Sequence, residues 1–291
     1  MEIRLMGPYE YELSKRLWLK CFQDDGKEFV DYYYAERTKP EYALGAFPAG
    51  QPEPVAMLHM LPMRMRFGEE LKDVCFVAGV CTDPKLRRRG YCRELFEAAF
   101  KIMGKRGFSA SVLQPFDTAF YERLGYRSYA YRRVYTLSDE CAKCVGRTDE
   151  NAVPEPLLLL SQYNSFMSGY SGGSLRSEEY FSKLIREFRL PGALIKTTPE
   201  GCCAGYFEGE RFTAYELYFN KGARGVLQNL LPSCSGGVSF ALPCDMDIAP
   251  LLGDIPAECI IKAEDEPFCM TAPVKEELPA CEAPAYCMDR Y

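Results

Sequence analysis

A basic run around a single glycine contains the residue types best suited to bind a ligand. It extends from Arg87 to Gly90, between an apolar segment at 77–82 and a helical pattern that starts at Tyr91. The first N–H groups of a helix have no intrahelical acceptor and attract anions, and guanidinium groups suit phosphate. The alternative is a solvated basic run with an ordinary turn glycine. We predict a binding site for a pyrophosphate group.

A second candidate is a tyrosine about thirty residues later, in the aromatic stretch from Phe120 to Tyr126. Tyr121 lies on a predicted short helix that Asp117 or Thr118 caps and Gly125 ends. A phenol has a pKa of ~10, so a tyrosine can donate a proton at neutral pH. The alternative interpretation is a core tyrosine on an aromatic-rich helix.

Together the two segments resemble a known family. The spacing Arg-x-x-Gly-x-small from Arg87 to Cys92, followed by Phe-Tyr-x-x-x-Gly-Tyr, is similar to the acetyl-CoA-binding core of the GCN5-related N-acetyltransferases (GNAT). The run from Val77 to Gly90 resembles the Eis-like (enhanced intracellular survival) branch of that superfamily. The resemblance covers roughly the first half of the chain. It departs from the family at Cys92, where Gly or Ala is usual, but cysteine is also small.

The resemblance implies acetyl-CoA as co-substrate and a fold to hold it. The expected fold is α/β with a mixed sheet, a GNAT-type acyltransferase fold, followed by a second, degenerate GNAT-like domain that has lost the cofactor loop. Pyrophosphate is expected at the helix start, and pantetheine along the end of the preceding strand. The residues expected to bind the cofactor are Val80, Cys81, Thr82, Arg88, Arg89, Gly90, Tyr91, Cys92, Arg93, Phe116 and Asp117.

The implied reaction is acetyl transfer to a primary amine by direct attack, with Tyr121 as general acid. The acceptor is expected to be a polyamine, an aminoglycoside-like compound or a lysine side chain. The base stays open. His59, the only histidine, lies within an apolar strand and reads as a core residue. In Eis-like proteins the terminal carboxylate is the base, here that of Tyr291, and a water relay is the other choice.

Two functions of other classes remain as alternatives. One is a non-catalytic module that binds or senses acyl-CoA. The other is a metal or redox protein based on the 14 cysteines. Cys141 and Cys144 form a single C-x-x-C pair, whereas a structural zinc site needs four ligands. We therefore expect no metal, and cysteines that act as small buried hydrophobic residues without disulfides.

Composition indicates a globular, cytoplasmic protein with no membrane partner. The chain has 291 residues, 47% of them apolar, with no apolar window long enough for a membrane span and no secretion signal at its start. Residues 1–150 carry 24 basic and 22 acidic side chains, and the remainder carry 11 and 19. A nucleic-acid partner is not expected, because neither half has a basic face. A homo-oligomer stays open, since Eis-like relatives assemble.

Periodicity predicts the elements that position these residues. In the first half we expect strands at 2–5, 42–47, 55–66, 74–82, 108–113 and 126–137, with a bulge near Pro62 and helices at 11–22, 29–38 and 91–103. The fifth strand should run parallel to the fourth, joined by the helix that starts at Tyr91. In the second half, strands are expected at 192–196, 202–208 and 212–219, and a helix at 223–231. The predicted domains are 1–140 and 157–291, joined by a linker at 141–156.

Overall fold

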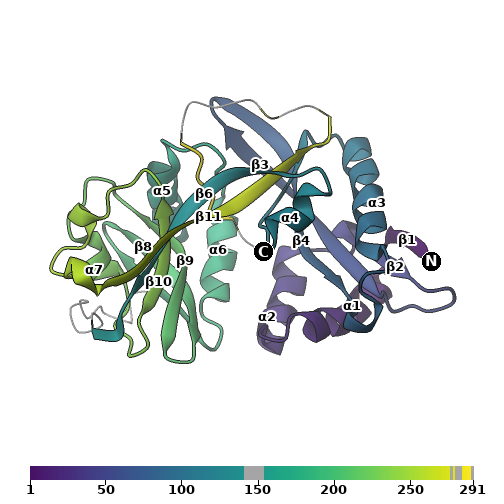
Figure 1. Cartoon of the computed structure of the whole chain (residues 1–291), viewed down its shortest axis with the longest axis horizontal. Coiled ribbons are helices and arrows are strands. Elements are labelled where there is room, and N and C mark those ends of the chain that lie inside the picture. Colours follow the sequence, from purple (N-terminus) through teal and green to yellow (C-terminus); the bar gives the residue numbers. More distant parts are fainter. Residues whose placement is uncertain (141–153, 276–277, 279–283, 290–291) are drawn as a thin grey trace. The chain divides into compact units, whose positions relative to one another are not determined.

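A computed structural model describes residues 1–140, 154–275, 278 and 284–289 (Figure 1). Residues 1–129 and 268–275 belong to one compact unit, and residues 130–140, 154–267 and 284–288 belong to a second. Strands β6 (Arg127–Leu137) and β11 (Ile260–Pro273) contribute residues to both units. The domain limits expected from the sequence stay a prediction, and most of the expected linker lies outside the described residues.

The first unit alternates strands and helices along the chain. Its elements are β1 (Glu2–Leu5), α1 (Pro8–Cys21), α2 (Lys27–Tyr32), a π-helical turn (Tyr33–Arg37), β2 (Ala43–Phe47), β3 (Ala56–Phe67), β4 (Glu70–Thr82), α3 (Tyr91–Arg106), β5 (Ala110–Leu113) and α4 (Thr118–Glu122). The turn between β3 and β4 is shorter than the gap between the predicted strands at 55–66 and 74–82. Strand β4 already begins at Glu70, because Glu70 to Asp73 pair with β3.

The sheet of this unit has the order β1-β2-β3-β4-β5 and ends on the last residues of β11. Neighbouring strands are antiparallel except β4 and β5, which are parallel, as predicted, with α3 as the crossover. Met270 to Pro273 of β11 pair with β5. The sequence did not predict this last strand.

Helices cover both faces of the sheet. Residues of β2 and β3 alternate between two apolar cores because successive strand side chains point to opposite faces. Leu44 and Leu58 pack with α3, whereas Ala43 and Met57 pack with α1 and the aromatic residues that follow it. Helix α1 is thereby held against β4, which places the end of α1 beside the end of the strand.

A β-bulge shapes the last part of β4. Met57 pairs with Cys81 and His59 with Ala78, so Gly79 and Val80 lie opposite Leu58 alone. Gly79 has φ +58°, and a Cβ atom there would lie 2.5 Å from the Trp18 ring. Only glycine satisfies both conditions. The predicted bulge at Pro62 is therefore wrong: Pro62 pairs regularly with Cys75.

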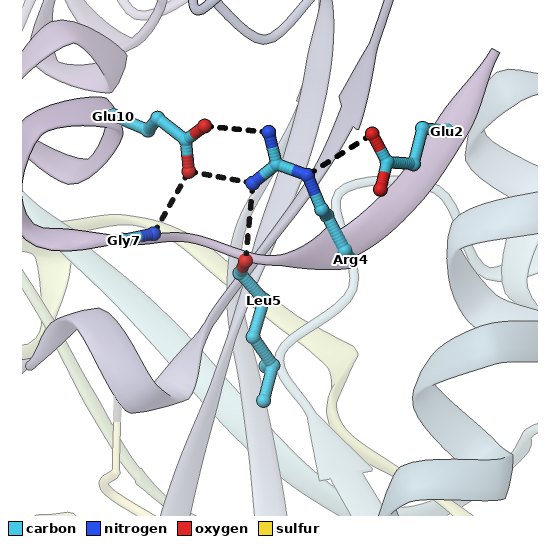
Figure 2. Close-up of polar contacts among 5 residues, drawn as sticks. All are labelled: Glu2, Arg4, Leu5, Gly7 and Glu10. Atoms are coloured by element: carbon cyan, nitrogen blue, oxygen red, sulfur yellow. Dashed lines mark hydrogen bonds and ion pairs between the residues drawn. The ribbon is translucent and has the colours of Figure 1, made fainter.

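Helix α1 is fixed at its start by a charged cluster (Figure 2). Glu10 accepts two hydrogen bonds from the guanidinium of Arg4, at 2.6 and 2.5 Å, and a third from the N–H of Gly7, at 2.8 Å. Arg4 also pairs with Glu2. Glu10 thus satisfies the N-cap backbone and ties β1 to α1. The hydrogen bond from Arg4 is the main reason why the pKa of Glu10 is lowered.

We expect Glu10→Ala to lower the free energy of unfolding by about 1 kcal/mol at pH 7, the usual loss for a helix N-terminal cap. Because the folded-state pKa of Glu10 lies below its ordinary value of 4.5, this stability is present above pH ~4.5 and is lost as the pH falls through the lowered pKa. Urea unfolding at pH 7 and pH 3 measures both effects. Glu12→Ala is the control, since Glu12 makes only an exposed ion pair with Lys15. An equal loss at both pH values would contradict the assignment.

The strands of the second unit follow in the same sheet in the order β6-β10-β9-β8-β7, with β11 beside β6. The helices and remaining strands of this unit are α5 (Pro156–Met167), α6 (Glu178–Glu187), β7 (Ala193–Thr198), β8 (Gly201–Glu208), β9 (Arg211–Phe219), α7 (Val226–Leu230) and β10 (Val238–Pro243). The three strands predicted in this half are confirmed. The helix predicted at 223–231 is shorter, because Gly225 takes φ +64° just before α7.

In the described residues, no helix is long and apolar enough to cross a membrane.

Candidate functional site

The first unit contains a cavity of about 630 Å³ beside the end of β4 and the start of α3. Its lining combines apolar side chains with five arginines. The residues that line it are Cys21, Phe22, Val80, Cys81, Thr82, Leu86, Arg87, Arg88, Arg89, Gly90, Tyr91, Cys92, Arg93, Phe116, Phe120, Arg123 and Leu124. The structure therefore brings together ten of the eleven residues predicted to bind the cofactor. Asp117 is the exception.

The loop before α3 is arranged to bind an anion. Arg88 has φ +65°, and Gly90, the N-cap of α3, has φ +88°. A left-handed arginine is uncommon, and residues in such conformations cluster at functional sites. The first N–H groups of α3, from Tyr91 to Arg93, have no acceptor within the helix. Backbone donors and exposed guanidinium groups therefore share one end of the cavity.

The start of this loop is fixed by ion pairs and backbone contacts. Lys20 Nζ donates to Asp83 Oδ2 at 2.5 Å, and Asp83 also accepts from the N–H of Lys85 at 3.0 Å. These contacts, with Lys20 first, lower the pKa of Asp83. Arg87 Nε donates to the carbonyl of Thr82 at 3.3 Å. The loop is thus held against both α1 and β4.

The end of β4 offers an unpaired strand edge. Strand β5 pairs with β4 only from Val74 to Phe76, whereas β4 continues to Thr82. On its other edge, β4 pairs with β3. Among the described strands, none pairs with Val80 to Thr82 on the β5 side. An extended ligand in the cavity can hydrogen-bond to this edge as another strand would.

Tyr121 does not line the cavity but packs against residues that do. It is 3% exposed, and its ring packs against Phe116 and Phe120, with centroids 5.4 and 5.1 Å away. Both phenylalanines line the cavity, as does Cys92. Burial raises the pKa of Tyr121 well above its ordinary value, and the nearby Cys92 and Asp117 add to the rise. The phenol therefore stays protonated at neutral pH.

The two residues predicted after β5 have different roles. Phe116 is 74% exposed and lines the cavity. Asp117 is the N-cap of α4, as one of the two predicted caps, and accepts a hydrogen bond from the N–H of Phe120 at 3.2 Å. Its side chain is engaged with the helix, outside the lining. Asp117 therefore acts on the site by placing the helix that carries Tyr121.

The sequence interpretation missed the part of the lining that α1 contributes. Cys21 and Phe22 follow the helical pattern of the other core residues of α1, so nothing in their spacing marks them as site residues. Arg123 and Leu124 also line the cavity. They occupy the unspecified positions of the Phe-Tyr-x-x-x-Gly-Tyr motif.

His59 lies in the core and not in the cavity lining. It is fully buried between the rings of Trp18 and Tyr33, and Tyr33 Oη lies 3.1 Å from His59 Nδ1. Burial lowers the pKa of His59 to about 3, so the imidazole is neutral at physiological pH. The interpretation of His59 as a core residue is confirmed. Tyr291, the other candidate base, lies outside the described residues.

The cysteines follow the prediction with one correction. Ten described cysteines are free thiols, whereas Cys259 forms a disulfide. The expectation of no disulfides is therefore wrong for Cys259. This residue is the last of a short 3₁₀ turn and is buried. Within the described ranges, no cluster of three or more His, Cys, Asp or Glu side chains could hold a metal ion. Cys141 and Cys144 fall outside these ranges.

Comparison with known proteins identifies the first unit. Residues 2–129 match the family model of the acetyltransferase (GNAT) domain. No curated protein sequence matches the chain.

Solved structures resemble the chain over nearly its whole length. Eis1 from Mycobacterium abscessus is 16% identical, with a TM-score of 0.67 over 94% of this chain and 74% of that one. A probable N-acyltransferase from Enterococcus faecalis is 15% identical, with a TM-score of 0.68 over 94% and 73%. A putative acetyltransferase from Pyrococcus horikoshii is 15% identical, with a TM-score of 0.57 over 98% and 94%. At these identities the similarity establishes the fold, and the predicted mixed α/β fold of the GNAT type is confirmed.

Proposed function

Residues 2–129 make this chain a member of the GNAT acetyltransferase family, and on that premise we propose that it transfers the acetyl group of acetyl-CoA to a primary amine. The cavity is the observation that carries the proposal. Its lining includes Arg88, Arg89 and the N-terminus of α3, and it also includes the end of β4, whose edge is not paired by β5. A ligand with an anionic diphosphate and an extended amide chain has the chemistry that these two features recognise.

The cofactor is placed by backbone and guanidinium groups. The diphosphate accepts hydrogen bonds from Arg88, Arg89 and the first N–H groups of α3, where Gly90 lets the backbone approach closely. The pantetheine amides pair with the edge from Val80 to Thr82. A backbone N–H of this segment faces the thioester carbonyl and stabilises the oxyanion that forms on attack.

Proton transfer is assigned to Tyr121. The amine attacks the thioester carbon, the C–S bond breaks, and the leaving thiolate takes a proton from the phenol. The attacking nitrogen loses its extra proton to water as the amide forms, and Tyr121 regains a proton from solvent. The attacking ammonium group, with an ordinary pKa of ~10.4, must first lose a proton, and a water relay serves as base in this scheme. The terminal carboxylate of Tyr291 remains the other candidate.

The test is a panel of amines that covers polyamines, aminoglycosides and lysine peptides, incubated with acetyl-CoA and the full chain. Acetylated amine is measured by mass spectrometry, because the protein's own thiols would react with a thiol reagent. We expect product with at least one amine class, and CoA release only when that amine is present. Acetyl-CoA binding in calorimetry without product from any amine would contradict the transferase proposal.

A second candidate is a module that binds acyl-CoA without catalysis. The burial of Tyr121 behind Phe116 and Phe120 favours it, since the phenol does not line the cavity. Under this candidate, acetyl-CoA binds, and neither the wild type nor Tyr121→Phe acetylates any amine. Turnover with an amine eliminates it.

A further inference from the structure

Three cysteines line the cavity, and two of them form a pair. Cys21 is the last residue of α1, and Cys81 lies in β4 just after the bulge. Both are free thiols within hydrogen-bonding reach of each other. Cys21 Sγ also donates to the carbonyl of Thr82 at 3.4 Å. The fold thus brings together two thiols that are sixty residues apart in the chain.

The surroundings make the two thiols unequal. The hydrogen bond from Cys81 and the charge of Arg87 lower the pKa of Cys21 to about 7, against the opposing effects of burial and of Asp83. Burial raises the pKa of Cys81 well above its ordinary value. At neutral pH Cys21 is therefore partly in the thiolate form, whereas Cys81 stays a thiol. A thiolate is the form of cysteine that reacts with disulfides.

The two thiols also differ in their access to solvent, and Cys21 is the more accessible. Cys21 is half-buried and faces the cavity, whereas Cys81 is 8% exposed. Both cysteines line the cavity, and the more reactive one is also the more exposed. The second sulfur stays beside it and is shielded from direct attack.

We infer that Cys21 and Cys81 form a thiol–disulfide exchange site for low-molecular-weight disulfides. The Cys21 thiolate attacks one sulfur of the disulfide RSSR, forms a mixed disulfide and releases RS⁻. The Cys81 thiol then loses its proton and attacks the sulfur of Cys21, which breaks the mixed disulfide and releases a second RS⁻. Two protein thiols are oxidised to one disulfide, RSSR is reduced, and the two RS⁻ groups take up the thiol protons.

This activity goes beyond the proposed acetyl transfer and does not depend on it. Its chemistry uses no acetyl-CoA and no amine. A disulfide between the end of α1 and β4 would lie in the lining of the acetyl-CoA cavity, so the oxidation state of the pair affects the cavity wall. The source of RSSR can be glutathione disulfide or the disulfide of CoA, which share the reacting S–S group.

The experiment uses the full chain, reduced and freed of reductant, with an excess of glutathione disulfide. Intact mass spectrometry and peptide mapping follow the products with time. We expect a disulfide-linked peptide pair that contains Cys21 and Cys81. In Cys81→Ser, the mixed disulfide with glutathione should accumulate on Cys21. In Cys21→Ser, Cys81 should remain reduced.

Cys234→Ser is the matched control. Cys234 is also half-buried and also donates to a backbone carbonyl, that of Gly237 at 3.0 Å, but burial raises its pKa. This variant should form the Cys21–Cys81 disulfide at the wild-type rate. Glutathione on Cys234 or Cys92 before Cys21, or no link between Cys21 and Cys81, would overturn the inference.

Alkylation gives a second readout that does not need a cysteine variant. In the wild-type protein, the rate of iodoacetamide labelling at Cys21 should rise through a midpoint near pH 7, whereas Cys234 should respond only at higher pH. A midpoint for Cys21 above that of Cys234 would contradict the inference. Parallel reactions with CoA disulfide identify the source: faster oxidation than with glutathione disulfide assigns the site to CoA disulfide, and slower or equal oxidation assigns it to small disulfides in general.

Discussion

Tyr121→Phe is expected to lower kcat by about 10²–10⁴-fold, the usual contribution of a general acid, and to leave the affinity for acetyl-CoA unchanged. The substitution removes one hydroxyl and keeps the ring that packs between Phe116 and Phe120. The fold should therefore be retained. Steady-state kinetics with the best amine acceptor and calorimetry with acetyl-CoA measure the two quantities separately.

The pH dependence of the wild-type rate is an independent test of the role of Tyr121. Burial raises the pKa of Tyr121, so the acid stays protonated above pH 10, and the wild-type rate should not fall through the ordinary tyrosine range. Tyr135→Phe is the control, because Tyr135 is a buried tyrosine of the second unit. Unchanged kcat in Tyr121→Phe would remove the phenol from the mechanism.

The double variant Arg88→Gly/Arg89→Ala is expected to bind acetyl-CoA about 10²–10⁴-fold more weakly than the wild type. Each lost hydrogen bond between a guanidinium and a phosphate is worth about 1.5–3 kcal/mol. Glycine is chosen at position 88 because Arg88 has φ +65°, a conformation that glycine adopts without strain. We therefore expect the loop to keep its shape, so that a change in affinity for acetyl-CoA reflects the loss of the two guanidinium groups.

Calorimetric titration measures the affinity for acetyl-CoA. Titrations with CoA and with dephospho-CoA show to which phosphate groups the contacts are lost. Arg64→Ala is the matched control: it removes an exposed arginine of β3 that pairs with Asp73 and does not line the cavity. The control should bind acetyl-CoA like the wild type. Equal affinities in all three proteins would mean that the loop before α3 does not hold the diphosphate.

The motif at the start of α3 could be read from the sequence because its determinants are local. An apolar strand, a proline at Pro84, a glycine at Gly90 and a helical stripe follow one another within about thirty residues. Each depends on backbone preferences and on the burial of neighbouring side chains. The parallel pairing of β4 and β5 followed from the crossover rule. These elements contain most of the predicted site.

The bulge in β4 and the pairing of β11 could not be read in this way. Pro62 looked like the break in the ladder, but the extra residue is in β4, where Trp18 packs closely against Gly79. Likewise, Met270 to Pro273 pair with β5 across more than 150 residues of sequence. A strand pattern shows that a segment pairs, but its partner depends on which edge the rest of the fold leaves open.

Residue spacing alone was enough to predict a GNAT domain in the first part of the chain, with a basic, glycine-containing loop at the start of a helix, because these features lie close together. The tertiary structure alone decided that Cys21 lies beside Cys81 in the cavity and that Tyr121 lies behind its wall. Those positions depend on how α1 and α4 pack against the sheet. Packing joins side chains from distant segments, and a pattern of spacings within one segment carries no record of such neighbours.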